Sequence, residues 1–276
     1  MNEASASAEE RAILQHLTRA DAVLGALIAA AGPYRPRRGT AASTFDALLR
    51  AIAHQQLHGK AAAAILGRLA LCFEGRYPLP AELCAMPETQ LRAAGFSLAK
   101  IASLKDLAQR SCAGLVPEAR ALALLSDAQI IEQLTQVRGI GRWSVEMLLM
   151  FELSREDVLP VDDFGVRNGF RLAYGLRKLP PPRALARYGE RWAPYRSVAA
   201  WYLWRAVELA REGRLPAPRE RVRLPRARTR SKRPPARRAA APSAGAAGAA
   251  PPRPKGARTR ARPRPAPRSR ARGKRR

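Results

Sequence analysis

Two adjacent carboxylates, Asp162 and Asp163, are the side chains of this sequence best suited to chemistry. Pro160 precedes them, and the segment 165–174, which has helical spacing of its apolar residues, follows them. A carboxylate at a helix start faces free backbone N–H groups and the positive end of the helix dipole, which stabilise its charge. A fixed anion of this kind can stabilise a cation that develops during a reaction. The alternative is an ordinary N-cap, which accounts for one aspartate but not for both.

A tight turn between two helices is predicted by the segment Leu134-Thr-Gln-Val-Arg-Gly139-Ile-Gly141-Arg142-Trp143. Gly139 and Gly141 allow a hairpin that Cβ atoms would block, and they let the backbone approach another surface. Ile140 would fix the turn to the core. The free N–H groups of a helix that starts near Arg142 form a site for a phosphate. A plain turn between helices is the alternative, but the full pattern favours binding to the DNA backbone.

The histidines and cysteines suggest neither a metal site nor a cofactor. His54 and His58 are four residues apart, which is half of a zinc site, but surface or DNA-facing histidines are the better interpretation. Cys72, Cys84 and Cys112 are odd in number and irregularly spaced, which argues against a disulfide framework and fits a reducing compartment. Three thiolates are too few for a cysteine-ligated iron–sulfur cluster. We therefore expect no cofactor and no metal.

The elements that must position these residues are predicted to be helices. Apolar residues recur at helical spacing throughout an all-α body over about residues 8–215. Short segments that contain Gly or Pro separate the stripes, and no alternating pattern requires a sheet. We expect two lobes with a cleft between them. The clearest stripes cover residues 45–69, 98–107, 143–153 and 198–210.

The charge of the chain is concentrated at its C-terminus. The 276 residues carry a net charge of +28, and residues 217–276 alone contain 22 Lys and Arg and one acidic residue. This Arg-, Pro- and Ala-rich tail has almost nothing to bury and is predicted to be disordered. It is either a solubilising extension or a nonspecific DNA tether, and its single sign of charge favours the tether. Without a membrane-length apolar run or a signal peptide, we expect a cytoplasmic, nucleoid-associated protein.

The hairpin 137–143 followed by residues 159–163 resembles the helix-hairpin-helix DNA glycosylases, most closely those of the DNA-3-methyladenine glycosylase II type. Residues 52–65, 91–96 and 192–204 also fit, so that the resemblance spans residues 21–210. It implies an all-α, two-lobed glycosylase domain over 21–215, an N-terminal extension over 1–20 and the tail over 216–276. About forty residues precede Phe45, too few for the N-terminal β-rich domain of the best-known bacterial relative, which indicates the compact form.

The resemblance implies a role for each matched residue. Asp163 would be catalytic, which leaves Asp162 as the cap. Trp143 stands where relatives that also cut the DNA strand carry a Schiff-base lysine, so the enzyme would be monofunctional and use water as nucleophile. The remaining matches fall into two groups. Trp143, Met147 and Trp204 would form the base pocket with Leu57 as the wedge in the stack, while Gln56, Arg138, Gly139, Ile140, Gly141 and Arg142 would bind DNA. Met147 replaces an aromatic residue of the best-known bacterial relative, so the pocket would be less aromatic.

The implied activity is hydrolysis of the N-glycosidic bond of alkylated purines, such as 3-methyladenine and 7-methylguanine, during base excision repair. A monomer would flip the damaged base out of double-stranded DNA and hold its positive charge against aromatic rings. Asp163 would stabilise the sugar cation, orient water, or both. Two alternatives stay open: a noncatalytic hairpin protein that binds DNA, against which Asp163 argues, and a glycosylase/lyase that uses a different lysine.

Overall fold

The computed structural model describes residues 7–36 and 39–217, and within these ranges it contains helices and loops but no strand. This confirms the predicted all-α class. The predicted tail lies outside the described residues from residue 218 onward. In chain order the elements are α1 (Ala8–Ala20), α2 (Ala22–Ala31), α3 (Thr44–His54), α4 (Gly59–Leu71), α5 (Pro80–Ala85), α6 (Glu88–Ala94), α7 (Leu98–Cys112), α8 (Ala119–Leu122), α9 (Asp127–Leu134), α10 (Arg142–Met147), the π-helix η1 (Leu148–Glu152), α11 (Phe164–Ala173), α12 (Pro182–Gly189), the 3₁₀-helix η2 (Glu190–Trp192) and α13 (Arg196–Arg211).

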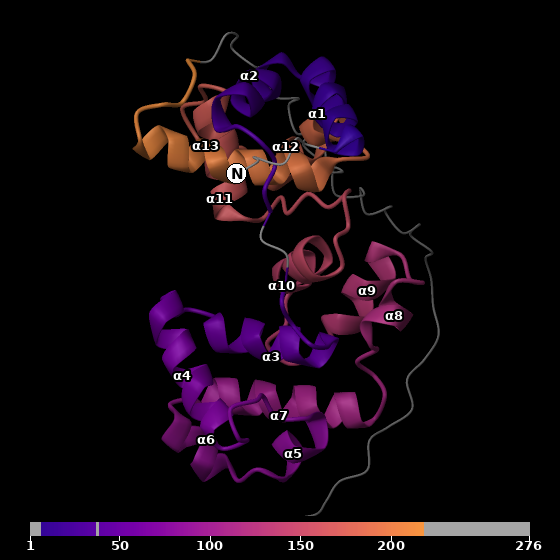
Figure 1. The fold of residues 1–276 in the computed structure, drawn as a ribbon, viewed down its shortest axis with the longest axis vertical. Helices are drawn as coiled ribbons and strands as arrows, with labels where there is room; N and C mark the ends of the chain where they lie inside the picture. Colours follow the sequence, from indigo (N-terminus) through magenta and orange to yellow (C-terminus); the bar gives the residue numbers. More distant parts are fainter. Residues whose placement is uncertain (1–6, 37–38, 218–276) are drawn as a thin grey trace, which may run out of the picture. The chain divides into compact units, whose positions relative to one another are not determined.

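These helices form two groups (Figure 1), and each group encloses a hydrophobic core. The first core is formed by helices α3 to α10 together with η1. The second core joins the N-terminal helices α1 and α2 to the C-terminal helices α11, α12 and α13. Met150, on η1, packs against both cores. The chain therefore leaves the second core after α2, builds the first, and returns at α11.

Helix α1 is part of the folded body. Its residues Ile13 and Leu17 are buried in the second core. This agrees with the helical body predicted from residue 8 onward. The family resemblance, in contrast, begins only at residue 21. Asp21 then caps α2 by accepting from the backbone of Val23 and Leu24. Its other oxygen accepts from the side chains Tyr174 Oη at 2.7 Å and Trp192 Nε1 at 3.0 Å. One buried carboxylate thus ties the N-terminal helices to the C-terminal ones.

The helical stripe predicted over residues 45–69 is two helices rather than one. Helix α3 ends at His54 and α4 begins at Gly59. Hydrogen bonds between the residues at the break and distant segments explain it. Lys100 Nζ donates to Ala53 O at 2.7 Å, which satisfies a free carbonyl at the helix end, and Gln55 Nε2 donates to Gly139 O at 2.7 Å. The next residue, Gln56, has a left-handed φ of 57°. Contacts from distant segments therefore override the local apolar spacing.

The stripe predicted over residues 143–153 also contains an irregularity. After six residues α10 gives way to the π-helix η1. A π turn inserts an extra residue, so side chains beyond it point in directions that a regular helix would not give. Phe151 and Glu152 lie in this turn. The chain near Gly39 packs on it, since Gly39 N donates to Phe151 O at 2.9 Å.

Helices α11 and α13 cross closely in the second core. A Cβ atom on Gly169 would lie 1.8 Å from the backbone oxygen of Leu203, so only glycine permits this crossing. Trp204 follows Leu203 in the chain, and the crossing brings it to the start of α11. The packing of two helices therefore joins residues that are 41 positions apart in the sequence.

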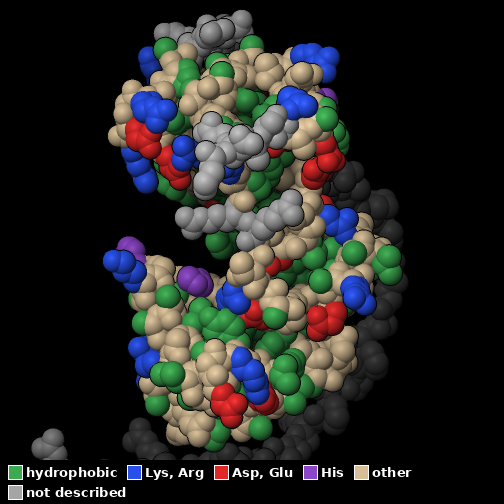
Figure 2. Space-filling model, viewed as in Figure 1, with side chains coloured by type: hydrophobic (Ala, Val, Ile, Leu, Met, Phe, Trp, Pro, Cys, Tyr) green, Lys and Arg blue, Asp and Glu red, His purple; other side chains and the backbone are tan. Residues whose placement is uncertain are grey.

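The surface of the described residues is mixed in charge. Figure 2 shows Lys and Arg side chains interspersed with Asp and Glu over the visible face, as expected from the sequence before the tail, which holds 28 basic and 21 acidic residues. No helix in the described part of the chain is long and apolar enough to cross a membrane.

Candidate active site

The carboxylate of Asp163 accepts three hydrogen bonds from N–H groups. Oδ1 accepts from the backbone of Val166 at 2.7 Å and from Trp204 Nε1 at 2.9 Å. Oδ2 accepts from Trp143 Nε1 at 2.8 Å. Hydrogen bonds to an ionised acceptor are among the stronger ones in proteins, and they fix the plane of the carboxylate. Asp163 is half-buried, and this arrangement holds a negative charge in one orientation at the start of α11.

The expected division of roles between the two aspartates is wrong. Asp163, not Asp162, is the N-cap of α11, while Asp162 is exposed. One residue combines the two functions because a carboxylate has two oxygens. Oδ1 caps the helix and also binds Trp204, and Oδ2 remains for Trp143. The cap is therefore part of what orients the candidate catalytic group.

Gly165 allows Trp204 to reach Asp163. A Cβ atom at this position would lie 2.7 Å from Trp204 Cδ1 and 2.8 Å from Trp204 Nε1. These distances are too short for any side chain, so a larger residue would displace the indole. The hydrogen bond between Trp204 and Asp163 therefore depends on the absence of a side chain two residues after the carboxylate.

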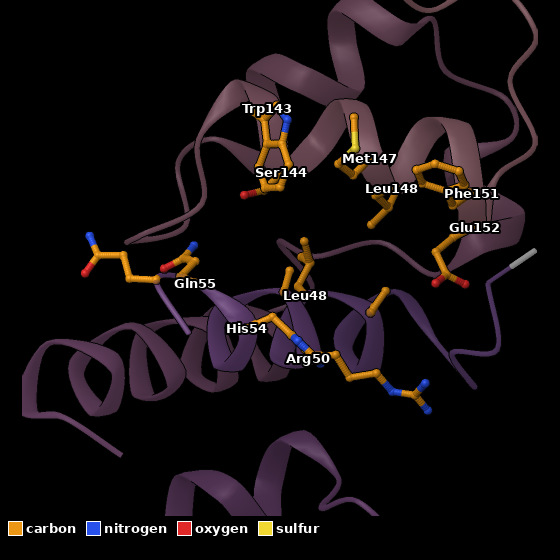
Figure 3. A pocket seen from close by; sticks show the side chains of 13 residues that line it. Leu48, Arg50, His54, Gln55, Trp143, Ser144, Met147, Leu148, Phe151 and Glu152 are labelled. Atoms are coloured by element: carbon orange, nitrogen blue, oxygen red, sulfur yellow. The ribbon is translucent and has the colours of Figure 1, made fainter. Parts of the chain in front are cut away.

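A cavity of about 360 Å³ lies between α3 on one side and α10 with η1 on the other (Figure 3). Its volume is in the range of small-molecule binding sites. Of the three residues that the resemblance assigned to the base pocket, Trp143 and Met147 line the cavity, whereas Trp204 does not. Trp204 stacks instead on Phe151, with ring centroids 5.9 Å apart, and Phe151 lines the cavity.

Phe151 is the main residue of the cavity that sequence reasoning missed. Met147 stands where the family resemblance would place an aromatic residue, but Phe151 adds an aromatic ring to the lining. The pocket is therefore more aromatic than Met147 alone suggested. The place of Phe151 eight residues after Trp143 on the same helical stripe was the available signal. The other lining residues that were not predicted come from both sides of the cavity: Ala47, Leu48, Arg50, Ala51, His54, Gln55, Ser144, Leu148 and Glu152.

The predicted hairpin is present between α9 and α10. Gly139 has a left-handed φ of 78°, and a Cβ there would lie 2.5 Å from Ser103 Oγ, so glycine is required. Ile140 is buried and fixes the turn to the first core, as predicted. Asp106 on α7 accepts from the backbone N–H of Arg138 at 2.8 Å. At Gly141, the N-cap of α10, a Cβ would meet no atom within 4 Å. This position is therefore open on the outside of the turn.

The turn between α3 and α4 carries the two remaining predicted residues. Gln56 is exposed, has a left-handed backbone and lines the cavity. Leu57 is 39% exposed and lies next to Gln56 in the chain, outside the cavity lining. The structure thus brings Gln56, Trp143 and Met147 together at the cavity. Asp163 is linked to this group by its hydrogen bond from Trp143.

Comparison with known proteins gives a consistent result. Residues 49–194 match the family described as HhH-GPD superfamily base excision DNA repair protein. The chain is 44% identical over 197 residues to DNA-3-methyladenine glycosylase 1 of Schizosaccharomyces pombe, covering 71% of this chain and 86% of that one. The solved structure of the Schizosaccharomyces pombe enzyme Mag1 in complex with abasic DNA matches with a TM-score of 0.66 and 43% identity, covering 72% of this chain and 98% of the other. A DNA-3-methyladenine glycosidase structure from Bacillus halodurans matches with a TM-score of 0.67 and 33% identity, covering 72% and 91%.

Proposed function

Because this chain belongs to the HhH-GPD superfamily of base excision DNA repair proteins, we propose that it is a monofunctional DNA glycosylase that removes alkylated purines such as 3-methyladenine and 7-methylguanine from double-stranded DNA. The observation that carries the proposal is the carboxylate of Asp163, oriented by three N–H donors and joined through Trp143 to a cavity of base-binding size. A finer assignment to the DNA-3-methyladenine glycosylase II type rests on the matched residues of the sequence, the hairpin 137–143 and residues 159–163.

The cavity between α3 and η1 would receive the flipped base. Chemistry on a base requires its removal from the stack, at a cost of a few kcal/mol. A purine alkylated at N3 or N7 carries a positive charge, and aromatic faces attract cations by about 0.5–2 kcal/mol. Trp143 and Phe151 are the aromatic side chains that line the cavity. A cationic base also leaves as a neutral molecule, so its departure needs no strong acid.

Asp163 would act on the sugar. As the base leaves, the sugar becomes an oxocarbenium cation, which a nearby fixed anion stabilises. The three N–H donors engage both oxygens of Asp163 and fix the carboxylate in one orientation. This fixed orientation favours electrostatic stabilisation of the cation as its main role, with orientation of the attacking water as a second role. Trp143 has no amine and cannot form a Schiff base, which supports the monofunctional reaction.

The hairpin and the turn between α3 and α4 would hold the DNA. Backbone N–H groups near Gly139 and Gly141 and the side chains of Arg138 and Arg142 are suited to phosphates. The exposed Leu57 is proposed to fill the gap that the flipped base leaves. Replacing Leu57 by Ala should slow base release from duplex DNA far more than from a single strand, where no stack has to be filled. An equal effect on both substrates would rule out the wedge.

The proposed activity is tested by incubating methylated DNA with the purified protein and identifying released bases by chromatography. Free 3-methyladenine and 7-methylguanine are expected, and their absence would favour the noncatalytic alternative. Borohydride treatment separates the lyase alternative, because only a Schiff base would give a covalent complex with DNA. The Asp163→Asn variant is the control for contaminating activity.

A further inference from the structure

We propose that Glu146 is a positioning residue that fixes the guanidinium of Arg142 for contact with a DNA phosphate. The inference rests on the proposed function only in taking DNA as the partner of the hairpin. Neither the composition nor the family resemblance singles out Glu146, which lies on α10 one turn after Arg142.

The two side chains form an ion pair with very unequal exposure. Arg142 Nε lies 2.8 Å from Glu146 Oε1, and Arg142 is 64% exposed whereas Glu146 is 3% exposed. The carboxylate is therefore fixed inside the protein while the guanidinium reaches the surface at the first position of α10. Within the described part of the chain, Nη1 and Nη2 of Arg142 have no protein partner. These donors remain available for an anion outside the protein, and a planar guanidinium binds phosphate well.

The burial of Glu146 needs a reason. Desolvation raises the pKa of Glu146, the charges of Asp162 and Asp163 raise it further, and Arg142 opposes the change. An acid in such a place is unfavourable unless it is paired, and it gains little for the fold over an apolar residue. Its placement is explained if the carboxylate serves to hold Arg142 in one position, because a long exposed side chain otherwise loses conformational entropy when it binds.

The same short helix connects this pair to the candidate catalytic group. Trp143, the residue after Arg142, donates to Asp163, and Met147, the residue after Glu146, lines the cavity. A phosphate bound by a fixed Arg142 would therefore be held in register with Asp163 and with the cavity. Glu146 would contribute to the placement of the DNA without touching it.

The test compares Glu146→Ala with Glu212→Ala in the full-length protein. Both variants remove one negative charge and one Arg–Glu pair, since Glu212 pairs with Arg214 at 2.9 Å on the surface. A general charge effect would tighten binding of either variant to a duplex that contains a tetrahydrofuran abasic analogue. We expect Glu212→Ala to bind the duplex slightly more tightly and Glu146→Ala to bind it about 5-fold more weakly, which is opposite in sign.

A double-mutant cycle shows whether Glu146 acts through Arg142. In an Arg142→Ala background, Glu146→Ala should weaken binding no further. The isosteric Glu146→Gln, which keeps an acceptor for Arg142 Nε, should fold if Glu146→Ala does not, and it should show an intermediate loss of affinity. The Glu146 variants should show a higher Kd and KM for DNA, while their single-turnover rates at saturating enzyme should change little. Additive effects in the cycle, or tighter binding by both Glu146 variants, would overturn the proposal. Failure of the wild type to release bases would overturn the proposed function instead, since the binding cycle requires no catalysis.

Discussion

The indole N–H of Trp143 donates to Oδ2 of Asp163 at 2.8 Å, although the two residues are 20 positions apart. The ring of Trp143 also lines the cavity and is 48% exposed. One side chain therefore lines the proposed site of the base and, through its indole N–H, binds the proposed catalytic carboxylate. The position of a bound base and the orientation of Asp163 are linked through this residue.

Asp163→Asn should reduce the single-turnover rate of base release at least about 100-fold, because the charge that stabilises the sugar cation is lost. Asn is also a good N-cap through its Oδ1, so the fold and the affinity for DNA should be kept, while the melting temperature should fall slightly because Nδ2 cannot accept from Trp143 Nε1. Asp162→Asn is the matched control. Since Asp162 is exposed and does not cap α11, the Asp162→Asn variant should have a rate and a stability close to those of the wild type. A fully active Asp163→Asn would refute the mechanism.

Trp204→Phe should lower the single-turnover rate about 10-fold, which corresponds to one hydrogen bond to a charged group. The variant keeps a ring against Phe151 and removes the donor to Asp163 Oδ1. Because Trp204 does not line the cavity, the affinity for a lesion-containing duplex should not change. Trp143→Phe makes the same deletion at Oδ2, and a similar fall is expected. A rate as high as that of the wild type in both variants would show that the indole donors do not orient the carboxylate.

Gly165→Ala should lose activity without losing stability. The new methyl group displaces Trp204 from Asp163, while alanine favours the helix over glycine by about 1 kcal/mol, which offsets the strain. Gly169→Ala, on the same helix, should instead destabilise the fold by about 3 kcal/mol, because its methyl group meets the backbone of Leu203, which cannot move aside. Thermal melting and single-turnover rates of the two variants check this contrast. Comparable destabilisation of both would contradict it.

The enzyme should prefer cationic lesions to neutral ones such as hypoxanthine. A cationic purine leaves as a neutral molecule, whereas a neutral purine leaves as an anion and needs a proton. Asp163 accepts three hydrogen bonds and is arranged as an acceptor, not as a donor. The measurement compares single-turnover excision of 7-methylguanine and hypoxanthine in one duplex, each corrected for spontaneous depurination. Equal enhancement for both would indicate recognition by shape.

Deletion of residues 217–276 should weaken DNA binding and make it less dependent on salt. The segment holds 22 Lys and Arg, and each phosphate that such a residue contacts releases counterions. The single-turnover rate on a short duplex at saturating enzyme should be nearly unchanged, because the site residues all precede the deletion. Identical plots of log Kd against log salt concentration for the two proteins would show that the tail does not bind DNA.

The sequence alone determined the features that depend on neighbours along the chain. The hairpin follows from Gly139 between two helical segments, because glycine readily adopts the left-handed backbone that the turn requires. The carboxylate at the start of α11 follows from an aspartate before a helical stripe, and the all-α class follows from apolar spacing. Each of these signals is read within about ten residues, the range over which helix starts, turns and side-chain periodicity are set.

Only the tertiary structure decided which of the two aspartates caps α11 and what orients it. The donors to Asp163 come from α10 and α13, and Trp204 reaches Asp163 because Gly169 lets α13 cross against α11 and Gly165 leaves room for the indole. The break between α3 and α4 depends likewise on Lys100 and on the carbonyl of Gly139. Such contacts depend on how helices pack, which is set by side chains distant in sequence, so no local pattern records them.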